Sequence, residues 1–289
     1  MNLKLYIGAH KTATTHVQNL LANNRELLSS QQTSLSIPPD TRQEWLPLLI
    51  DYLRTKNSDT LNKIRGLAPK TETWILAEEN IPGVSNELRI KPGLYTDLEK
   101  RLQGIKEAYP NANIEVYFSV RSYESFYRSA YLEVVRNKGY FPFHEFYDSN
   151  RFKSNSWVNV AESITNVFDQ KQIYMWRYED FSTLLPSILK HLTSLSDDAV
   201  QDMINSYKVR VTRPSISAKT LQLLASSTTH SKDESIQLLE QLNEHYPANQ
   251  QNGYYQPFNP EINSSFKEQY KLDIQAVKNN YPSINFLSI

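Results

Sequence analysis

Short apolar stretches alternate along this chain with longer segments of helical periodicity, and this alternation restricts the possible folds most. Four stretches have the pattern of strands, at residues 3–7, 74–77, 114–120 and 173–176. Helical patterns fill the segments between them and dominate after residue 180. Strands separated by helices are typical of a parallel sheet with right-handed crossovers. We therefore expect an α/β fold in which helices flank a parallel sheet, followed by a helical C-terminal part.

The length of the chain and the absence of repeats and linkers favour one domain. Its 289 residues lie within the range of one large or two average domains. The sequence contains no internal repeat, low-complexity tract or convincing linker. We expect a single domain over residues 1–289, with a core at about 1–185 and the helical part at about 186–289.

The charge balance and the absence of cysteine exclude several classes of function. The 31 basic residues equal the 31 acidic ones, so the chain lacks the excess positive charge of a general nucleic-acid binder. Without cysteine it forms no disulfide or thiolate metal site, and its six histidines show no ligand spacing, so we expect no metal.

No apolar stretch approaches the roughly 20 residues that span a bilayer, and the N-terminus lacks a signal-peptide pattern. We expect a cytoplasmic protein.

The segment 8–15 connects the first predicted strand to the first predicted helix. A helix N-terminus has unpaired N–H groups and a partial positive charge, so it can bind an anion. Ala13 stands where the loop of nucleotide triphosphatases needs a glycine, so the usual seat for magnesium and a γ-phosphate is missing. We predict a cradle for a phosphate-like group, and the alternative is a helix start capped by its own threonines. The cradle would consist of Lys11, Thr12, Ala13, Thr14 and Thr15.

A second candidate anion site follows the strand at 114–120. Arg121 comes directly after this strand, at the edge of the sheet where ligands gather in open α/β folds. Ser129 lies eight residues further on, about two helical turns away and on the same helix face. An arginine fork beside a hydroxyl suits a second phosphate. The alternative is an arginine in a structural salt bridge and a serine in a core contact.

The two constellations together resemble the sulfotransferases that use 3′-phosphoadenosine 5′-phosphosulfate (PAPS). In that family a loop like the one at 11–15 binds the 5′-phosphosulfate, and an arginine followed eight positions later by serine binds the 3′-phosphate. The segment 176–180 also looks like one that follows a later strand in many bacterial members. The resemblance implies a P-loop-like fold, PAPS as donor, and Arg121 and Ser129 as ligands of the 3′-phosphate.

The sequence departs from the family pattern at two places. Tyr123 stands where the family often has proline, and the Arg-Lys-Gly loop of cytosolic animal members has no clear counterpart. The missing loop, together with the glutamates that follow the strand at 74–77, resembles the bacterial and carbohydrate-directed branches, so we expect a carbohydrate or glycoconjugate acceptor. A small alcohol or phenol stays open.

Glu78 and Glu79 directly follow the strand at 74–77 and are candidates for a general base. Adjacent carboxylates repel, which favours protonation of one of them, and a strand directs only one into a cleft. The resemblance implies a catalytic glutamate after this strand; we choose Glu79, with Glu78 as the alternative. His10 and His16 are the other candidate bases. His10 lies beside Lys11 and could contact the transferred group or the acceptor, whereas His16 lies inside the first predicted helix and we expect it to be structural.

The resemblance therefore implies transfer of a sulfuryl group from PAPS to an acceptor hydroxyl, in line and without a metal. Lys11 would stabilise charge on the leaving phosphate, and a glutamate would take the proton of the hydroxyl. Two alternatives are a nucleotide-dependent kinase on the same fold and a nucleotide-binding module without catalysis.

Overall fold

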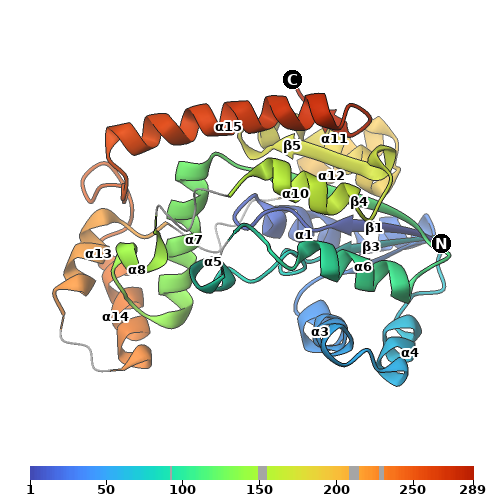
Figure 1. Ribbon diagram of the computed structural model, residues 1–289, viewed down its shortest axis with the longest axis horizontal. Coiled ribbons are helices and arrows are strands. Elements are labelled where there is room, and N and C mark those ends of the chain that lie inside the picture. Colours follow the sequence, from blue (N-terminus) through green and yellow to red (C-terminus); the bar gives the residue numbers. More distant parts are fainter. Residues whose placement is uncertain (92, 149–154, 208–214, 228–230) are drawn as a thin grey trace.

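A parallel sheet forms the centre of the protein, with helices on both of its sides (Figure 1). The computed structural model describes residues 1–91, 93–148, 155–207, 215–227 and 231–289. The six strands lie in the order β2-β3-β1-β4-β5-β6, and every neighbouring pair is parallel. The predicted α/β fold is thereby confirmed. The strands are β1 (Asn2–Tyr6), β2 (Thr33–Ser36), β3 (Thr73–Ala77), β4 (Asn113–Val120), β5 (Ile173–Arg177) and β6 (Asn285–Leu287).

Helices make up most of the connections between the strands. Those before β4 are α1 (Thr14–Asn23), α2 (Arg25–Ser30), α3 (Leu46–Thr55), α4 (Ser58–Gly66), α5 (Glu87–Ile90) and α6 (Leu98–Ala108). Those after β4 are α7 (Tyr123–Lys138), α8 (Phe143–Phe146), α10 (Trp157–Thr165), α11 (Phe181–Thr193), α12 (Asp197–Ser206), α13 (Ala218–Ala225), α14 (Lys232–His245) and α15 (Pro260–Asn280). Three shorter segments are the π-helical η1 (Thr41–Trp45) and the 3-10 turns η2 (Gln170–Gln172) and η3 (Tyr178–Asp180).

The sheet is buried on both faces, which explains why its strands look like short apolar runs in the sequence. On β4, Val116 and Phe118 face the core layer formed with α3, α6, α7 and α10. Tyr117, between them, faces the opposite layer, which is formed with α1, α2, α11 and α12. This alternation follows from the period of two in a strand.

The two strands at the edges of the sheet, β2 and β6, were absent from the sequence prediction. Each has three or four residues and few apolar side chains, so neither produces a recognisable periodic pattern. The C-terminal part is mostly helical, as predicted, but its end returns to the sheet, where Asn285 is paired with Tyr174 of β5. That the whole chain forms one domain stays a prediction.

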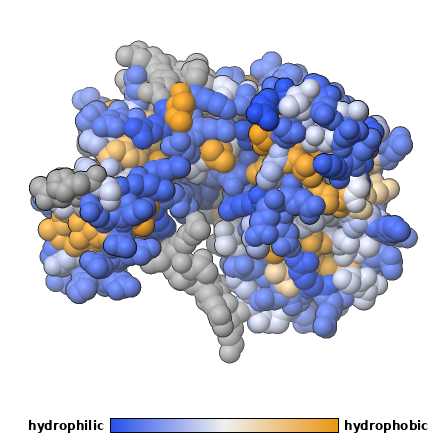
Figure 2. Space-filling model, turned by 90° about the horizontal axis from the view of Figure 1, so that it is seen from below, coloured by the Kyte–Doolittle hydropathy of each residue, from blue (hydrophilic) through white to orange (hydrophobic). Residues whose placement is uncertain are grey.

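The face of the molecule in Figure 2 is mostly hydrophilic, with apolar side chains in scattered patches, and it is hollowed between two sides of the molecule. One side carries α13 and α14, which stand next to α7 at the end of the molecule away from α3 and α4 (Figure 1). Of the helices that the structure describes, none is both long and apolar enough to cross a membrane.

The order of the strands sets the place of the candidate site. From β1 the chain proceeds to β2 at one edge of the sheet and returns to β3 next to β1, and it then crosses to β4 on the other flank of β1, so β1 and β4 flank a topological switch point. Ligands of open α/β sheets bind at the carboxyl ends of the strands at such a point. The loop at 8–13 and Arg121 both begin there.

A buried cluster of polar atoms holds the start of α7 next to α15 and α10. Asp273 accepts hydrogen bonds from the Tyr123 hydroxyl, from Ser156 Oγ at 2.9 Å and from the backbone N–H of Trp157 at 2.8 Å. Burial raises the pKa of Tyr123, so its hydroxyl keeps the proton that it donates. The indole Nε1 of Trp157 donates to the carbonyl oxygen of Arg121 at 2.9 Å. Tyr123 therefore anchors the chain beside Arg121.

We expect Asp273→Ala to lower the free energy of unfolding by about 2–3 kcal/mol, because it leaves buried donors without an acceptor. Asp273→Asn keeps one oxygen and should lose less. Urea denaturation measures both, with Asp202→Ala on the exposed face of α12 as the control, expected within about 0.5 kcal/mol of wild type. Equal stability of Asp273→Ala and Asp202→Ala would show that the cluster does not hold α15.

Candidate functional site

A cavity of about 850 Å³ opens at the carboxyl ends of β1, β3 and β4. Its volume lies within the range of small-molecule sites in proteins. Most of the site residues that we predicted from the sequence line this cavity. Those that line it are His10, Lys11, Ala13, Thr14, Thr15, Glu79, Arg121 and Ser129.

The loop between β1 and α1 is turned back on itself by two residues in the left-handed region, Lys11 (φ 64°) and Ala13 (φ 63°). Thr12 is fully buried and donates its hydroxyl to the carbonyl oxygen of Ala9 at 2.5 Å. The backbone N–H of Ala9 donates to the carbonyl oxygen of Ser119 on β4 at 3.1 Å. Thr12 therefore stabilises the loop, and its side chain does not face the cavity.

The start of α1 has the features of an anion site. No side chain caps this helix, so the alternative of a helix start capped by its own threonines is not found in this described segment. The hydroxyl of Thr14 is buried and, among the described residues, has no hydrogen-bond partner. Buried hydroxyls are rarely left unpaired, and a ligand oxygen at this helix start would satisfy it.

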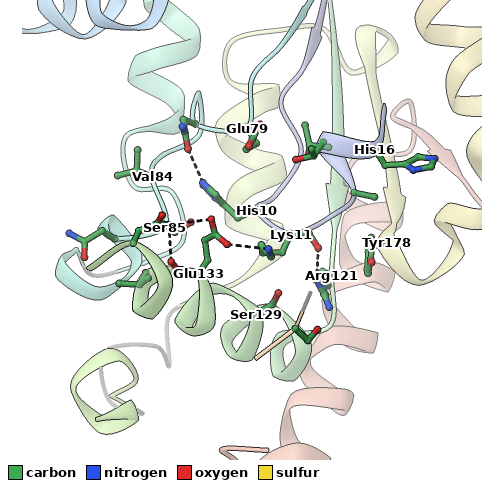
Figure 3. Close-up of a pocket in the computed structure, with 18 of the residues that line it drawn as sticks. His10, Lys11, His16, Glu79, Val84, Ser85, Arg121, Ser129, Glu133 and Tyr178 are labelled. Carbon is green, nitrogen blue, oxygen red and sulfur yellow. Dashed lines mark hydrogen bonds and ion pairs between the residues drawn. The ribbon is translucent and has the colours of Figure 1, made fainter. Parts of the chain in front are cut away.

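Arg121 extends from the end of β4 to the loop after β1. One of its terminal nitrogens donates to the carbonyl oxygen of Lys11, and Nε donates to Ser125 Oγ at 2.8 Å. Its Cζ atom lies 4.5 Å from the centre of the Tyr178 ring. Ser129, one turn beyond Ser125 on α7, lines the same cavity as Lys11 (Figure 3). The two predicted anion sites thus open onto one space.

The segment 176–180 supports this arrangement. Arg177 forms an ion pair with Asp180 at 2.7 Å, which shapes the turn after β5. Glu179 accepts the backbone N–H of Ser122 at 2.9 Å, next to Arg121. These contacts place the ring of Tyr178 against the guanidinium.

The two adjacent glutamates have different surroundings. Glu78 is fully buried, does not line the cavity, and accepts hydrogen bonds from Thr41 at 2.7 Å and from the backbone N–H of Asn80 at 3.0 Å. Burial raises the pKa of Glu78, and the hydrogen bond from Thr41 opposes the increase. Through these contacts Glu78 stabilises the loop after β3.

Glu79 faces the cavity, and each of its carboxylate oxygens has a donor. Arg42 Nη2 donates to Oε1 at 2.7 Å, and Gln18 Nε2 donates to Oε2 at 3.0 Å. Arg42 also donates through Nε to both oxygens of Glu78 at 3.1 Å, so one guanidinium offsets two adjacent negative charges. The carboxylate of Glu79 is therefore held in one orientation at the cavity wall.

His10 is almost entirely buried against Tyr95. The Tyr95 hydroxyl accepts the backbone N–H of His10 at 2.9 Å and lies 3.0 Å from Nδ1, to which it can donate. With Nδ1 as acceptor, Nε2 carries the proton and donates to Asn80 Oδ1 at 3.2 Å. Burial lowers the pKa of His10, so the ring is neutral near pH 7.

Three further residues of the site, Arg42, Gln18 and Glu133, were not predicted. Nothing in the sequence signals Arg42 or Gln18, because tertiary folding alone brings their segments to Glu79. Glu133 could have been found, since it lies four residues after Ser129 and therefore shares its helix face. Its carboxylate lies 3.3 Å from Lys11 Nζ (Figure 3).

Comparisons with known proteins give structural likenesses at low identity. No protein-family model and no curated protein sequence matches the chain. A sulfotransferase from Alicyclobacillus acidocaldarius is similar over 84% of this chain and 96% of its own, with 14% identity and a TM-score of 0.45. A retinol dehydratase in complex with androsterone and the inactive cofactor PAP is similar over 99% of this chain and 82% of its own, with 11% identity and a TM-score of 0.37. We base the proposed function on the residues of the cavity.

We expect Ala13→Gly to raise the free energy of unfolding by about 0.5–1 kcal/mol, because a left-handed conformation is unfavourable for alanine and easy for glycine. The matched control is Ala276→Gly in the interior of α15, which should lower it by about 1 kcal/mol. Thermal and urea denaturation measure both. A loss of stability in Ala13→Gly as large as that of the control would contradict the left-handed loop.

Proposed function

We propose that this protein is a sulfotransferase that moves a sulfuryl group from PAPS to an acceptor hydroxyl. The observation that carries the proposal is that two candidate anion sites line one cavity. Lys11 and the start of α1 form one of them, and Arg121 with Ser129 forms the other. A donor with phosphate groups at both its 5′ and 3′ positions needs two such sites.

The residues present fit the 5′ end of this donor. Lys11 would neutralise the charge that develops on the leaving phosphate, and α1 would offer its uncapped N–H groups. The hydroxyl of Thr14, which has no hydrogen-bond partner among the described residues, would gain an acceptor. Ala13 and Thr15 complete the wall of the cavity at this end, and buried Thr12 keeps the loop closed around it.

Arg121 and Ser129 would recognise the 3′-phosphate and so distinguish PAPS from ATP. The guanidinium is held on three sides by Lys11, Ser125 and Tyr178. This prior positioning lowers the entropic cost of binding a phosphate. An arginine fork also matches the oxygens of a phosphate better than a lysine does.

Glu79 would act as the general base. When the acceptor oxygen forms its bond to sulfur and the bond from sulfur to the leaving phosphate breaks, the hydroxyl proton goes to the Glu79 carboxylate. Arg42 and Gln18 keep this carboxylate fixed at the cavity wall. Glu78 is buried with its own partners, so Glu79 is preferred. His10 would contribute to positioning through its Nε2–H.

The acceptor is a carbohydrate or glycoconjugate in this proposal. Asn80, Ser85, Asn86 and Asn137 bring amide and hydroxyl groups to the cavity wall. Such groups both donate and accept hydrogen bonds, which suits a compound with many hydroxyl groups.

We expect adenosine 3′,5′-bisphosphate to bind more tightly than ATP, and Arg121→Ala to weaken the bisphosphate about 10- to 150-fold while adenosine 5′-phosphate changes far less. Isothermal titration calorimetry measures all three ligands. Ser129→Ala removes only a hydroxyl and should reproduce the selective loss on a smaller scale. Preference for ATP would favour a kinase, and equal losses for both adenosine phosphates would make Arg121 structural.

We expect Glu79→Gln to slow sulfuryl transfer about 100- to 10,000-fold, the usual effect of a lost general base. Affinity for adenosine 3′,5′-bisphosphate should stay the same or rise slightly, because a like charge is removed. Glu78→Gln is the matched control and should slow transfer less. A transfer assay with candidate sugar acceptors, combined with calorimetry, separates the two variants. A larger loss in Glu78→Gln would exchange the roles of the two glutamates. Full rates in both single variants and in the double variant would exclude both carboxylates and make His10 the next residue to test.

A further inference from the structure

Helix α7 carries polar side chains at four-residue intervals, at Ser125, Ser129, Glu133 and Asn137. Residues at this spacing lie on one helix face. Ser125 holds Arg121, and the other three line the cavity. The stripe therefore runs from the Arg121 end of the cavity past Lys11, and Glu133 is its one charged member.

Glu133 is a nearly buried carboxylate, with 11% of its side chain exposed. A charge at such a position needs compensation from neighbouring groups. Lys11 Nζ lies 3.3 Å from Oε2 and Arg136 Nη1 lies 3.7 Å from it, while Asn137 Nδ2 donates to Oε1 at 3.2 Å. The cation proposed for the 5′ group of the donor is thus paired with an acidic side chain of the same cavity.

This pairing conflicts with anion binding. An anion at the start of α1 attracts Lys11, and at a few ångströms it repels the carboxylate of Glu133. Lys11 is 30% exposed and has a long, flexible side chain, so it can turn from one partner to the other. Glu133 has Arg136 and Asn137 to retain part of its compensation after the exchange.

We propose that Glu133 is a built-in counter-ion of Lys11 that the 5′ group of the donor displaces, and that it thereby sets the affinity of the cradle for anions. The inference rests on the proposed function for the identity of the donor. Glu133 weakens anion binding, and it takes Lys11 back when the product nucleotide leaves. It is a positioning residue for Lys11, with no proton transfer assigned to it.

The test is the affinity of Glu133→Gln for adenosine 3′,5′-bisphosphate, measured by calorimetry. Removal of the competing charge should tighten binding at least about 10-fold. Glu107→Gln is the matched control, because Glu107 also pairs with a lysine, Lys56 at 2.9 Å, but does not line the cavity. Its affinity should equal that of wild type. Glu133→Met serves as the neutral variant if the glutamine variant does not fold.

The same substitution in a Lys11→Met background separates displacement from a general loss of negative charge. Without the lysine, Glu133→Gln should tighten binding by clearly less, because the ion pair between Lys11 and Glu133 that the donor has to break is already absent. Unchanged or weaker binding in Glu133→Gln would overturn the inference, as would an equal gain in the presence and absence of Lys11.

Failure of the proposed function gives a different pattern. If the wild-type protein binds no adenosine 3′,5′-bisphosphate, the proposed donor is wrong, and inorganic pyrophosphate becomes the probe of the cradle. Tighter pyrophosphate binding in Glu133→Gln than in wild type or Glu107→Gln would still support Glu133 as the counter-ion. No gain with either anion would overturn it.

Discussion

The hydrogen bond from the Arg121 guanidinium to the carbonyl oxygen of Lys11 connects the two halves of the site. Arg121 follows β4 and Lys11 follows β1, so the bond joins two loops at the carboxyl edge of neighbouring strands. The carbonyl group of Arg121 is held in turn by Trp157, which belongs to the cluster around Asp273. A polar chain of contacts thus extends from α15, near the C-terminus, to the loop after the first strand.

The charges that face the cavity are largely compensated within the protein. Arg42 lies between Glu78 and Glu79, and Lys11 lies next to Glu133. Charged groups at partly buried positions are costly unless they are paired, so these pairs allow the site to exist without a ligand. They also mean that an anionic ligand has to exchange partners with the protein. The affinity of such a ligand depends on the free energy of its new contacts minus that of the ion pairs that it breaks.

The loop after β1 shows how the backbone contributes to the site. Two residues in the left-handed region and the internal bond of Thr12 bend the chain, so that α1 starts at the cavity without a side-chain cap. The two left-handed residues cost conformational free energy within the loop. The buried contacts of β1 on both faces of the sheet hold the strand before the loop in place and so stabilise the bend. The resulting N-terminus is open to a ligand.

The sequence by itself determined the central strands, the flanking helices, and the positions of Lys11, Arg121 and Glu79, because period and adjacency to strand ends are local properties. It did not indicate β2 and β6, which are too short to have a period and depend on pairing with a neighbouring strand. Only the tertiary structure decided which glutamate faces the cavity, since Thr41 and Arg42 come to Glu78 from a distant segment. It also decided that Glu133 meets Lys11. The two residues lie 122 positions apart in the sequence, and the parallel pairing of β1 with β4 brings the segments that follow these strands together.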